Sequence, residues 1–463
     1  MESMTLGEIL TAVNGTLLGE FCELDTAVTD VETDSRTIHP GALFVPLVGE
    51  RFDGHAYINS ALENGAAGCF TARERESYLP GKFYIKVASP LRALRDLAAY
   101  YRTKFPVPLV GVTGSVGKTT TKDMLAAVLG MKYNVLKTEG NMNSREGMPL
   151  TLLRLNRSHE IAVIEMGMSQ AGEIDYLSGI AKPDVAVITN VGDAHIENLG
   201  SRENIFKAKC EIFNHLKQSG VAVLNGDDEL LRTLRGAVPF EAVFCGSSDG
   251  VDYRAEDISA GKSNSIHCTA VTPGERYEME IPALGRHMIY PALMAAAVGR
   301  RFGLTREEIL KGILQFEPTK MRMNVLRRGQ EITILNDTYN ANPQSMRAAI
   351  GVLSDSKSAF KMAVLGDMFE LGSLAPALHS GVGEYLGKAG IHCLVAVGEL
   401  SEHMARAAEK AGVPMVFHCA DKGEAIPVLK DNVRPDSTIL VKASRGMAME
   451  ELVDYLKRIT TEE

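Results

Sequence analysis

The stretch GVTGSVGKTT, from Gly111 to Thr120, decides the fold that we expect for this chain. An apolar run precedes it, and apolar residues at helical spacing follow it at Met124, Leu125, Val128 and Leu129. A strand, a glycine-rich loop and a helix in this order predict a phosphate-binding loop. The strict pattern G-x-x-x-x-G-K-[ST] is missed by one residue, because its first position holds Val112. A glycine-rich turn that binds no nucleotide is therefore the alternative interpretation.

The residue types in this loop are those that hold a triphosphate. Gly114 and Gly117 let the backbone curl so that successive N–H groups point inward, and the start of the following helix adds roughly half a positive charge. Lys118 would reach the β- and γ-phosphates, and the hydroxyl of Thr119 would bind Mg²⁺. We expect the ATP-binding residues of the loop to be Gly114, Ser115, Gly117, Lys118, Thr119 and Thr120.

Composition limits the class of protein. The 463 residues predict two or three domains, and 45% hydrophobic with 23% charged residues is ordinary for a soluble globular protein. The net charge of −9 argues against nucleic acid or an anionic membrane as the main partner. The seven cysteines form no C-x-x-C pair, which predicts reduced thiols in the cytoplasm. We expect no signal peptide and no membrane span, because the sequence lacks a basic leader and any long apolar run.

Residues 1–88 predict a small α/β domain. Thr5 can cap a short helix that carries Leu6, Ile9, Leu10 and Val13 on one face. Further on, Ser35 and Arg36 lie in a polar turn, and Phe52-Asp53-Gly54-His55 introduces an Ala-containing helix. The guanidinium of Arg36 suits a carboxylate or a diphosphate, although a solvated surface arginine is the alternative.

Residues 89–318 predict a central domain with a mostly parallel sheet, because short apolar runs alternate with helical patterns. Ligands of such sheets bind outside the carboxyl ends of the strands. One apolar run ends at Glu165 and another at Asn225. A third run ends shortly before Asn190 and His195. These polar residues therefore fall where the fold predicts chemistry.

Residues 319–463 repeat this alternation and predict a second α/β domain. Four apolar runs indicate strands, at residues 332–335, 362–365, 394–397 and 438–441. Asn342 and Pro343 form a helix cap and first-turn pair ahead of SMRAAIGVL. The region lacks G-x-G-x-x-G, so we do not interpret it as a dinucleotide-binding domain.

Several of these motifs together resemble the Mur ligases, the ATP-dependent amide-forming enzymes that build the peptide of bacterial cell-wall precursors. The motifs are the phosphate loop, the turn EMG, the loop TNVGDAHIENLGS, the helix IFKAKCEIF, the exit DTYNANPQSM, and the signatures VLGDMFELG and TDSR…LFVPLVGERFDGH. The resemblance covers nearly the whole chain. It implies an α/β protein of three domains: a uridine-nucleotide-binding domain, a central ATPase and a Rossmann-like C-terminal domain.

The resemblance also implies a reaction. ATP would phosphorylate the terminal carboxylate of UDP-MurNAc-tripeptide, and the amine of D-alanyl-D-alanine would attack the resulting acyl phosphate. A phosphate loop, a Mg²⁺-binding Thr119 and the carboxylate of Glu165 are parts for the first half of this chemistry. The expected partners are thus two small molecules, and we expect a monomer that binds no nucleic acid.

Site residues follow from the resemblance, position by position. Lys118, Glu165, His195 and Lys209 are implied to be catalytic, and Thr119, Glu165, His195 and Lys209 (as a CO₂-derived carbamate) to serve Mg²⁺. Arg322, Asp337 and Asn340, together with Asn342, are implied to meet ATP. Ser35, Arg36 and Asn143 are implied to bind the UDP-linked substrate, and Lys442, Ser444 and Arg445 to face substrate.

Alternatives stay open at several of these positions. His195 could be a solvated loop residue, Lys209 a surface lysine, and Asn340 and Asn342 only turn and cap residues. The family pattern G-x-H-x-x-x-N is matched at Gly285 and His287 but ends in Pro291, which offers no side-chain donor or acceptor for adenine. Rival functions are a sister ligase that adds another amino acid, a folylpolyglutamate synthase, and a P-loop switch or motor.

Overall fold

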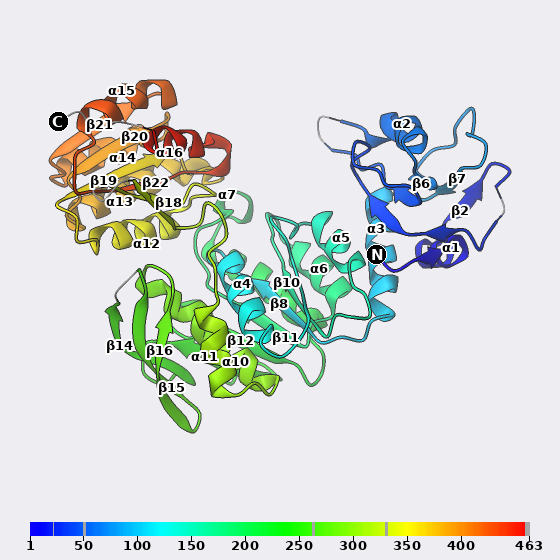
Figure 1. Cartoon of the computed structure of the whole chain (residues 1–463), viewed down its shortest axis with the longest axis horizontal. Helices are drawn as coiled ribbons and strands as arrows, with labels where there is room; N and C mark the ends of the chain where they lie inside the picture. The colour runs from blue at the N-terminus through cyan, green and yellow to red at the C-terminus, as the bar shows by residue number, and fades with distance from the viewer. Residues whose placement is uncertain (22, 50–51, 262–263, 329–331, 459–463) are drawn as a thin grey trace.

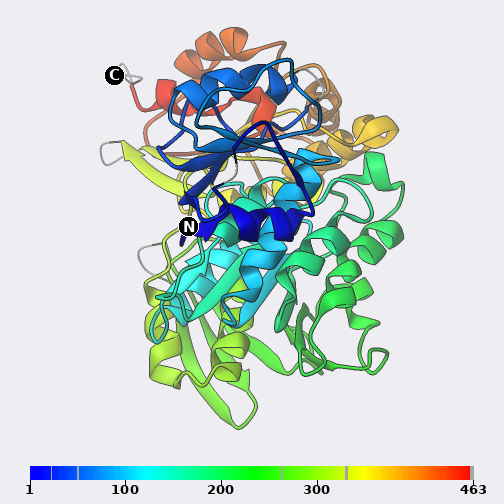
Figure 2. The same cartoon turned by 90° about the vertical axis from the view of Figure 1, so that its right-hand side faces the viewer.

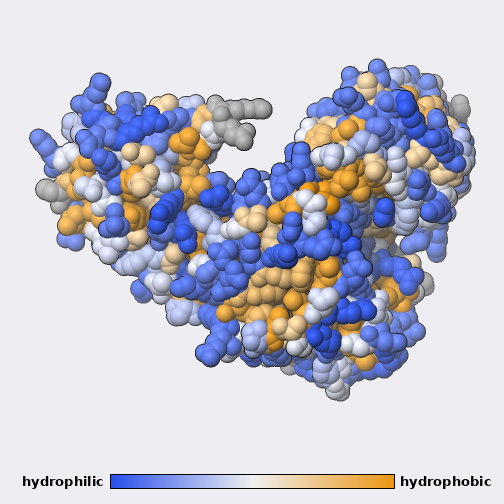
Figure 3. Space-filling view, turned by 180° about the vertical axis from the view of Figure 1, so that it is seen from behind, coloured by the Kyte–Doolittle hydropathy of each residue, from blue (hydrophilic) through white to orange (hydrophobic). Residues whose placement is uncertain are grey.

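A computed structural model describes residues 1–21, 23–49, 52–261, 264–328 and 332–458. The chain forms three lobes, and Figure 1 shows the N-terminal and C-terminal lobes on opposite sides of the central one. From the side, both outer lobes lie above the central lobe (Figure 2). A hollow separates the two outer lobes over the central lobe when the molecule is seen from behind (Figure 3).

The N-terminal lobe is a small α/β unit, as predicted. Thr5 caps its first helix, and the Thr5 hydroxyl and the Glu8 carboxylate form a capping box there. The larger sheet has the order β2-β7-β6-β5-β4, in which only β2 is antiparallel to its neighbour. Its elements are β1 (Met4–Thr5), α1 (Leu6–Val13), β2 (Thr16–Leu18), β3 (Ala27–Val28), β4 (Asp30–Glu32), β5 (Ala42–Phe44), η1 (Gly54–Tyr57), α2 (Ile58–Glu63), β6 (Gly68–Thr71) and β7 (Phe83–Lys86).

The central lobe is built on a sheet with the order β16-β15-β14-β13-β12-β11-β8-β10-β9, traced within the described residues. Its elements are α3 (Pro90–Thr103), β8 (Leu109–Thr113), α4 (Lys118–Leu129), β9 (Val135–Lys137), α5 (Gly147–Leu153), β10 (Ile161–Glu165), α6 (Glu173–Ala181), β11 (Val185–Ile188), α7 (Ile196–Leu199), α8 (Arg202–Cys210), η2 (Glu211–His215), β12 (Val221–Asn225), α9 (Glu229–Arg232), β13 (Glu241–Gly246), β14 (Tyr253–Ala260), β15 (Ile266–Thr272), β16 (Glu275–Ile281), η3 (Arg286–Met288), α10 (Ile289–Arg301) and α11 (Arg306–Leu314).

The parallel part of this sheet confirms the strand-helix alternation, but three strands at one edge were not predicted. Strand β15 pairs antiparallel with β14 on one side and with β16 on the other. Their sequences, such as RYEMEI, alternate exposed and buried residues. This period of two is typical of a sheet with one solvated face. It distinguishes these strands from the alternating strands and helices that we predicted for the whole central domain.

The C-terminal lobe contains a parallel sheet with one antiparallel edge strand, in the order β17-β18-β22-β19-β20-β21. The four strands predicted from apolar runs are β18, β19, β20 and β22. The elements are β17 (Asn324–Arg328), β18 (Ile332–Asn336), α12 (Pro343–Ser354), β19 (Phe360–Gly366), η4 (Gly372–Leu374), α13 (Ala375–Lys388), β20 (Cys393–Val397), α14 (Ser401–Lys410), β21 (Met415–Cys419), α15 (Lys422–Asn432), β22 (Ser437–Lys442), η5 (Arg445–Met447) and α16 (Glu450–Leu456).

The two faces of the central sheet bury different helices. On one face, Val110, Val112 and Val163 belong to the apolar cluster that α4, α10 and α11 complete. On the other face, Leu109 and Ile164 join the cluster that includes residues of α3, α5 and α6. Side chains of a strand alternate between faces, so the strands are apolar throughout, as buried parallel strands are.

The structure bears on the expectations about membrane spans and about cysteines. None of the described helices is both long and apolar enough to cross a membrane. Six of the seven cysteines are free thiols in the structure, and the seventh, Cys22, lies outside the described residues. Glu50 and Arg51, which belong to the N-terminal signature, also lie outside them.

Candidate active site

The loop between β8 and α4 has the backbone that the glycine pattern predicts. Gly114 has a φ of 148° and Gly117 a φ of 81°. A Cβ atom at Gly114 would lie 1.9 Å from the Thr189 hydroxyl oxygen, which is a severe steric clash. Both glycines are therefore required, Gly117 by its conformation and Gly114 by both conformation and space.

The end of β11 braces this loop from the side. The Thr189 hydroxyl donates to the Val116 carbonyl at 2.6 Å, and the Asn190 amide both donates to that carbonyl and accepts from the Val116 N–H at 2.9 Å. The Gly192 N–H donates to the Ser115 hydroxyl at 2.9 Å. The exit of a neighbouring strand thus holds the loop backbone through hydrogen bonds that do not involve the lysine side chain.

The first turn of α4 presents free donors. The N–H groups of Lys118, Thr119 and Thr120 have no carbonyl partner within the helix, because they belong to its first turn. All three residues line a cavity of about 1250 Å³. The Lys118 ammonium donates to the Gly114 carbonyl at 2.8 Å. Burial lowers the pKa of Lys118, and nearby Arg322 lowers it further while Glu165 opposes.

Glu165, at the end of β10, is buried, and only one of its two carboxylate oxygens has a hydrogen-bond partner among the described residues. Its Oε1 accepts a hydrogen bond of 2.7 Å from the Asn143 amide. Its Oε2 is buried and has no hydrogen-bond partner among the described residues. An unpaired buried carboxylate oxygen beside a phosphate loop is suited to Mg²⁺, which binds hard oxygen ligands. Together with the Thr119 hydroxyl, these residues fit the cation that the sequence implied.

Lys209, on α8, is not a surface lysine. Its side chain is only 1% exposed, and no hydrogen bond or ion pair engages its ammonium within the described part of the chain. Burial lowers the pKa of Lys209 well below its ordinary value, and the positive charge of Lys118 lowers it further. The alternative of a solvated residue on an amphipathic helix is therefore wrong.

His195 contacts the C-terminal lobe. It has a φ of 65° at the start of α7, and its Nδ1 lies 2.6 Å from Glu370 Oε2. Glu370 belongs to the predicted signature VLGDMFELG, but its partner could not be read from the sequence because the contact joins two domains. In this arrangement, Nδ1 of His195 faces a carboxylate of the C-terminal lobe.

The large cavity is shared between the central and C-terminal lobes. Among the predicted residues, it is lined by Ser115, Gly117, Lys118, Thr119, Thr120, Arg322, Asp337, Asn340, Asn342 and Lys442. Two segments far apart in sequence, the phosphate loop and the loop after β18, thus meet at one site. The predicted residues that do not line it are Ser35, Arg36, Gly114, Asn143, Glu165, His195, Lys209, Ser444 and Arg445.

Side chains of the C-terminal loop are held by one another. The Lys442 ammonium is buried and lies 2.5 Å from Asp337 Oδ2 and 2.8 Å from the Asn340 carbonyl. Asn342 caps α12 by accepting from the Ser345 N–H at 2.8 Å, which confirms its predicted capping role. Ser444 instead accepts a hydrogen bond of 2.9 Å from the Phe369 N–H, and Arg445 pairs with Glu450 at 2.6 Å.

Arg322 was predicted, but its stacking partner was missed. Its guanidinium carbon lies 4.1 Å from the centre of the Tyr339 ring. Its Nε is buried without a hydrogen-bond partner in the described part of the chain. Stacking on an aromatic face orients the guanidinium fork, and an unpaired buried N–H leaves it ready for an anion.

Pro291 lies in the first turn of α10 and lines the cavity, where the family pattern has asparagine. Its neighbour Tyr290 donates a hydrogen bond of 2.9 Å to Asp227 Oδ2. Asn225, which is 7% exposed, also lines the cavity. Polar groups are therefore available around Pro291, although proline itself contributes none.

The N-terminal lobe carries the residues expected to meet the UDP-linked substrate. Arg36 is 86% exposed and pairs with Asp34 at 2.6 Å. Hydrogen bonds from Arg36 lower the pKa of Asp34 to about 2. Asn143 belongs to the central lobe instead, where it holds Glu165. The structure therefore distributes these three predicted residues over two lobes.

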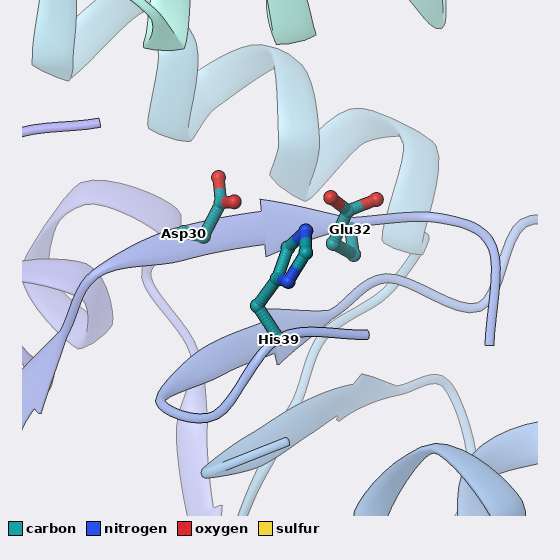
Figure 4. A group of neighbouring side chains, drawn as sticks. All are labelled: Asp30, Glu32 and His39. Atoms are coloured by element: carbon teal, nitrogen blue, oxygen red, sulfur yellow. The ribbon is translucent and has the colours of Figure 1, made fainter. Parts of the chain in front are cut away.

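The N-terminal lobe also holds a small cluster of titratable side chains. Asp30, Glu32 and His39 offer ligand atoms that all lie within 4.8 Å of one another (Figure 4). Burial and the charge of Asp30 raise the pKa of Glu32, and His39 opposes this. Exposed acidic groups of this kind are common in proteins without a metal ion, and no further observation points to one here.

Known proteins resemble this chain over its full length. A protein of Bacillus subtilis named UDP-N-acetylmuramoyl-tripeptide–D-alanyl-D-alanine ligase is 41% identical over 459 residues, which cover 98% of this chain and 99% of the relative. The protein of the same name from Escherichia coli is 36% identical, with 99% of each chain covered. A crystal structure of MurF from Acinetobacter baumannii superposes with a TM-score of 0.91 at 32% identity, covering 99% of each chain.

A structure of MurF ligase from Thermotoga maritima in complex with ADP has a TM-score of 0.83 at 30% identity, covering 93% of this chain and 97% of that one. Three family models match in order along the sequence. They are "Mur ligase family, catalytic domain" at residues 27–102, "Mur ligase middle domain" at residues 112–299 and "Mur ligase, glutamate ligase domain" at residues 321–445. The chain belongs to the Mur ligase family.

Proposed function

We propose that this protein is the ATP-dependent ligase that joins D-alanyl-D-alanine to UDP-N-acetylmuramoyl-tripeptide. The full-length relatives that carry this name support the choice of substrates. One observation in the structure carries the chemistry: the unpaired Glu165 Oε2 and the electrostatically coupled Lys118 and Lys209 lie around a phosphate loop. Such a site is built for activating a carboxylate by phosphoryl transfer.

The reaction has two steps, and the residues have separate roles in them. A carboxylate oxygen of the tripeptide attacks the γ-phosphorus of ATP, the bond to the β-γ bridging oxygen breaks, and ADP leaves. The amine of D-alanyl-D-alanine then attacks the acyl carbon, loses a proton and displaces phosphate. The N–H groups of Lys118, Thr119 and Thr120 hold the phosphates, and the Lys118 ammonium and Arg322 offset the developing negative charge. Bound Mg²⁺ would supply further charge neutralisation.

A carbamate on Lys209 belongs to the same proposal. The neutral Lys209 nitrogen attacks the carbon of CO₂, an N–C bond forms as one C=O π bond opens onto oxygen, and the nitrogen releases one proton. Burial and the charge of Lys118 favour the neutral amine that this reaction requires. The product would be an anionic oxygen ligand in place of a cation.

The UDP-linked substrate would engage the N-terminal domain through Ser35 and Arg36, with Asn143 beside the reacting carboxylate. The proposed domains are residues 1–88, 89–318 and 319–463, acting together in a cytoplasmic monomer. ATP would fill the cavity between the second and third domains, with adenine near Pro291 and Asn225. Asp337 and Asn340 would then meet the nucleotide from the third domain.

A coupled phosphate-release assay tests the function. With ATP and UDP-MurNAc-tripeptide present, we expect release to require D-alanyl-D-alanine, because the acyl phosphate is consumed only by that amine. Single amino acids in place of the dipeptide test for a sister ligase. Glutamate in particular tests for a folylpolyglutamate synthase. Release with any of these in place of the dipeptide, or release without an amine acceptor, contradicts the proposal.

We further expect the lobes to approach one another when both substrates bind, because each supplies part of the site. The candidate hinges lie near residues 88–108 and 315–322. Small-angle scattering should show a smaller radius of gyration with a nonhydrolysable ATP analogue and UDP-MurNAc-tripeptide together. An unchanged radius at saturating ligand would contradict a closing mechanism.

A further inference from the structure

Two arginines share one tyrosine on the central lobe. Arg95, on α3, has its guanidinium carbon 4.9 Å from the centre of the Tyr176 ring. Arg145, which precedes α5, lies 5.1 Å from the same centre. Tyr176 is on α6, so two helices and the loop before α5 bring these side chains together. The ring of Tyr176 orients both guanidinium groups by cation–π contact.

Neither guanidinium is neutralised by a contact. In the described part of the chain, no hydrogen bond or ion pair engages the side chain of Arg95 or of Arg145. Because both lie over one ring, the two cations are separated by no more than about one Debye length, which is about 10 Å at 0.1 M salt. Two like charges held this close, without a counter-ion, create a local positive potential on a protein whose net charge is −9.

Two acidic groups lie near the cluster, but neither forms an ion pair with Arg95 or Arg145 among the described residues. Asp96 and Glu146 are close enough to influence Tyr176 electrostatically. Glu146 accepts a hydrogen bond of 2.7 Å from the Ser144 hydroxyl, and Asp96 lies 3.9 Å from Arg92. The Tyr176 hydroxyl is buried without a partner among the described residues. Burial raises the pKa of Tyr176 to about 12, so its hydroxyl stays neutral at physiological pH.

The position of the cluster favours the UDP-linked substrate over ATP. None of its three residues lines the large cavity that the phosphate loop and the C-terminal domain share. Figure 1 shows α5 and α6 on the side of the central sheet that faces the N-terminal lobe, next to α3. The cluster therefore lies toward the domain that carries Ser35 and Arg36.

The cluster is also connected to the reacting carboxylate. Asn143, two residues before Arg145, holds Glu165 by a hydrogen bond of 2.7 Å. Two residues of chain span at most about 7 Å. A substrate that reaches from the Glu165 region to the N-terminal domain would thus pass close to Arg145.

We propose that Arg95 and Arg145 form a binding site for an anionic group of the UDP-linked substrate, either a free carboxylate of the peptide or the diphosphate. This inference rests on the proposed function, because that function supplies the substrate. The planar guanidinium fork matches both groups, and hydrogen bonds to a charged acceptor are strong. Tyr176 is a positioning residue, because both guanidinium groups contact its ring.

Calorimetric binding of UDP-MurNAc-tripeptide, without nucleotide or amine, tests the site directly. Arg95→Gln and Arg145→Gln are each expected to weaken binding about tenfold, and Arg145→Lys to recover part of the loss by keeping the charge. The KM values for ATP and D-alanyl-D-alanine should stay unchanged. Arg434→Gln is the matched control, because Arg434 also lies over an aromatic ring, that of Phe360, but in the C-terminal lobe.

The same titrations with UDP alone separate the two anions. Weaker binding of both ligands by the variants assigns the diphosphate, and weaker binding of the tripeptide form only assigns a peptide carboxylate. Raising the salt concentration should weaken wild-type binding more than binding by the double variant, which a purely structural role would not cause. Should the glutamine variants fail to fold, Arg95→Lys and Arg145→Lys carry the test. Each keeps the charge but loses the planar fork, so each should weaken binding of UDP-MurNAc-tripeptide, and wild-type affinity in both would overturn the inference.

Wild-type affinity in the folded double glutamine variant overturns the inference. That result would leave the proposed function intact as long as D-alanyl-D-alanine still triggers phosphate release. Absence of such release in the wild-type protein would instead contradict the proposed function, and the binding titrations would still report on the two arginines.

Discussion

Replacing Lys118 with alanine is expected to slow ligation by at least about a hundredfold while leaving the fold intact. The ammonium is placed against the phosphate loop by the Gly114 carbonyl at 2.8 Å. Loss of one preorganised donor to a developing charge costs at least about 2.7 kcal/mol, which is about a hundredfold in rate. The fold should survive, because hydrogen bonds from Thr189 and Asn190 hold the loop backbone.

The measurement is the kcat of phosphate release, with thermal unfolding as the check on folding. Lys132→Ala is the matched control, because Lys132 follows α4, is exposed and bonds to the Gly303 carbonyl. Near-normal activity of Lys118→Ala would show that this loop is not the ATP site, and the proposed function would fail with it.

Replacing Lys209 should have an effect at least as large, on the order of a thousandfold, with either alanine or arginine. At an unperturbed pKa of about 10.4, the neutral amine that captures CO₂ costs about 4.6 kcal/mol at pH 7. Burial and Lys118 reduce this cost by lowering the pKa of Lys209. Arginine keeps its positive charge and cannot form the carbamate, so the conservative change should fail too.

Partial rescue distinguishes the carbamate from a structural lysine. Short carboxylic acids added to Lys209→Ala should restore some activity by placing oxygens where the carbamate would be. Lys207→Ala, an exposed lysine on the same helix, is the control and should remain fully active. Full activity of Lys209→Arg, or an unmodified ammonium in a metal-bound crystal at neutral pH, would remove Lys209 from the mechanism.

These two predictions are coupled, because the charge of Lys118 is one reason why the pKa of Lys209 is low. Lys118→Ala would therefore also disfavour the neutral amine of Lys209. Effects of residues that share an electrostatic interaction do not add. The double variant should consequently lose less activity than the product of the two single losses.

Local patterns were enough to predict the parallel strands, the phosphate loop and the caps. Strand-helix alternation predicted β8 and α4, and Asn342 caps α12 as its sequence context indicated. Those features depend on residues that are close in sequence. The burial of Lys209 could not be derived in this way, since its helix carries exposed Lys207 only two positions earlier and burial is decided by tertiary packing.

Contacts between residues that are far apart in the sequence could not be predicted, for a related reason. His195 with Glu370, and Lys442 with Asp337, pair residues separated by more than a hundred positions. The residue types of a loop rich in Asn, Asp and His do not predict which carboxylate of another segment will contact it. The family resemblance supplied residue roles there, but the partners came only from the three-dimensional arrangement.

The strand order of the C-terminal lobe has a consequence for biosynthesis. The last strand to be made, β22, lies in the middle of its sheet, between β18 and β19. Until Ser437 to Lys442 have been synthesised, β18 and β19 lack the partner that joins them, and both expose unpaired backbone groups. Exposed strand edges promote pairing between chains. Nascent or prematurely terminated chains that stop before β22 are thus the species most at risk of aggregation, whereas the two preceding lobes can already have folded.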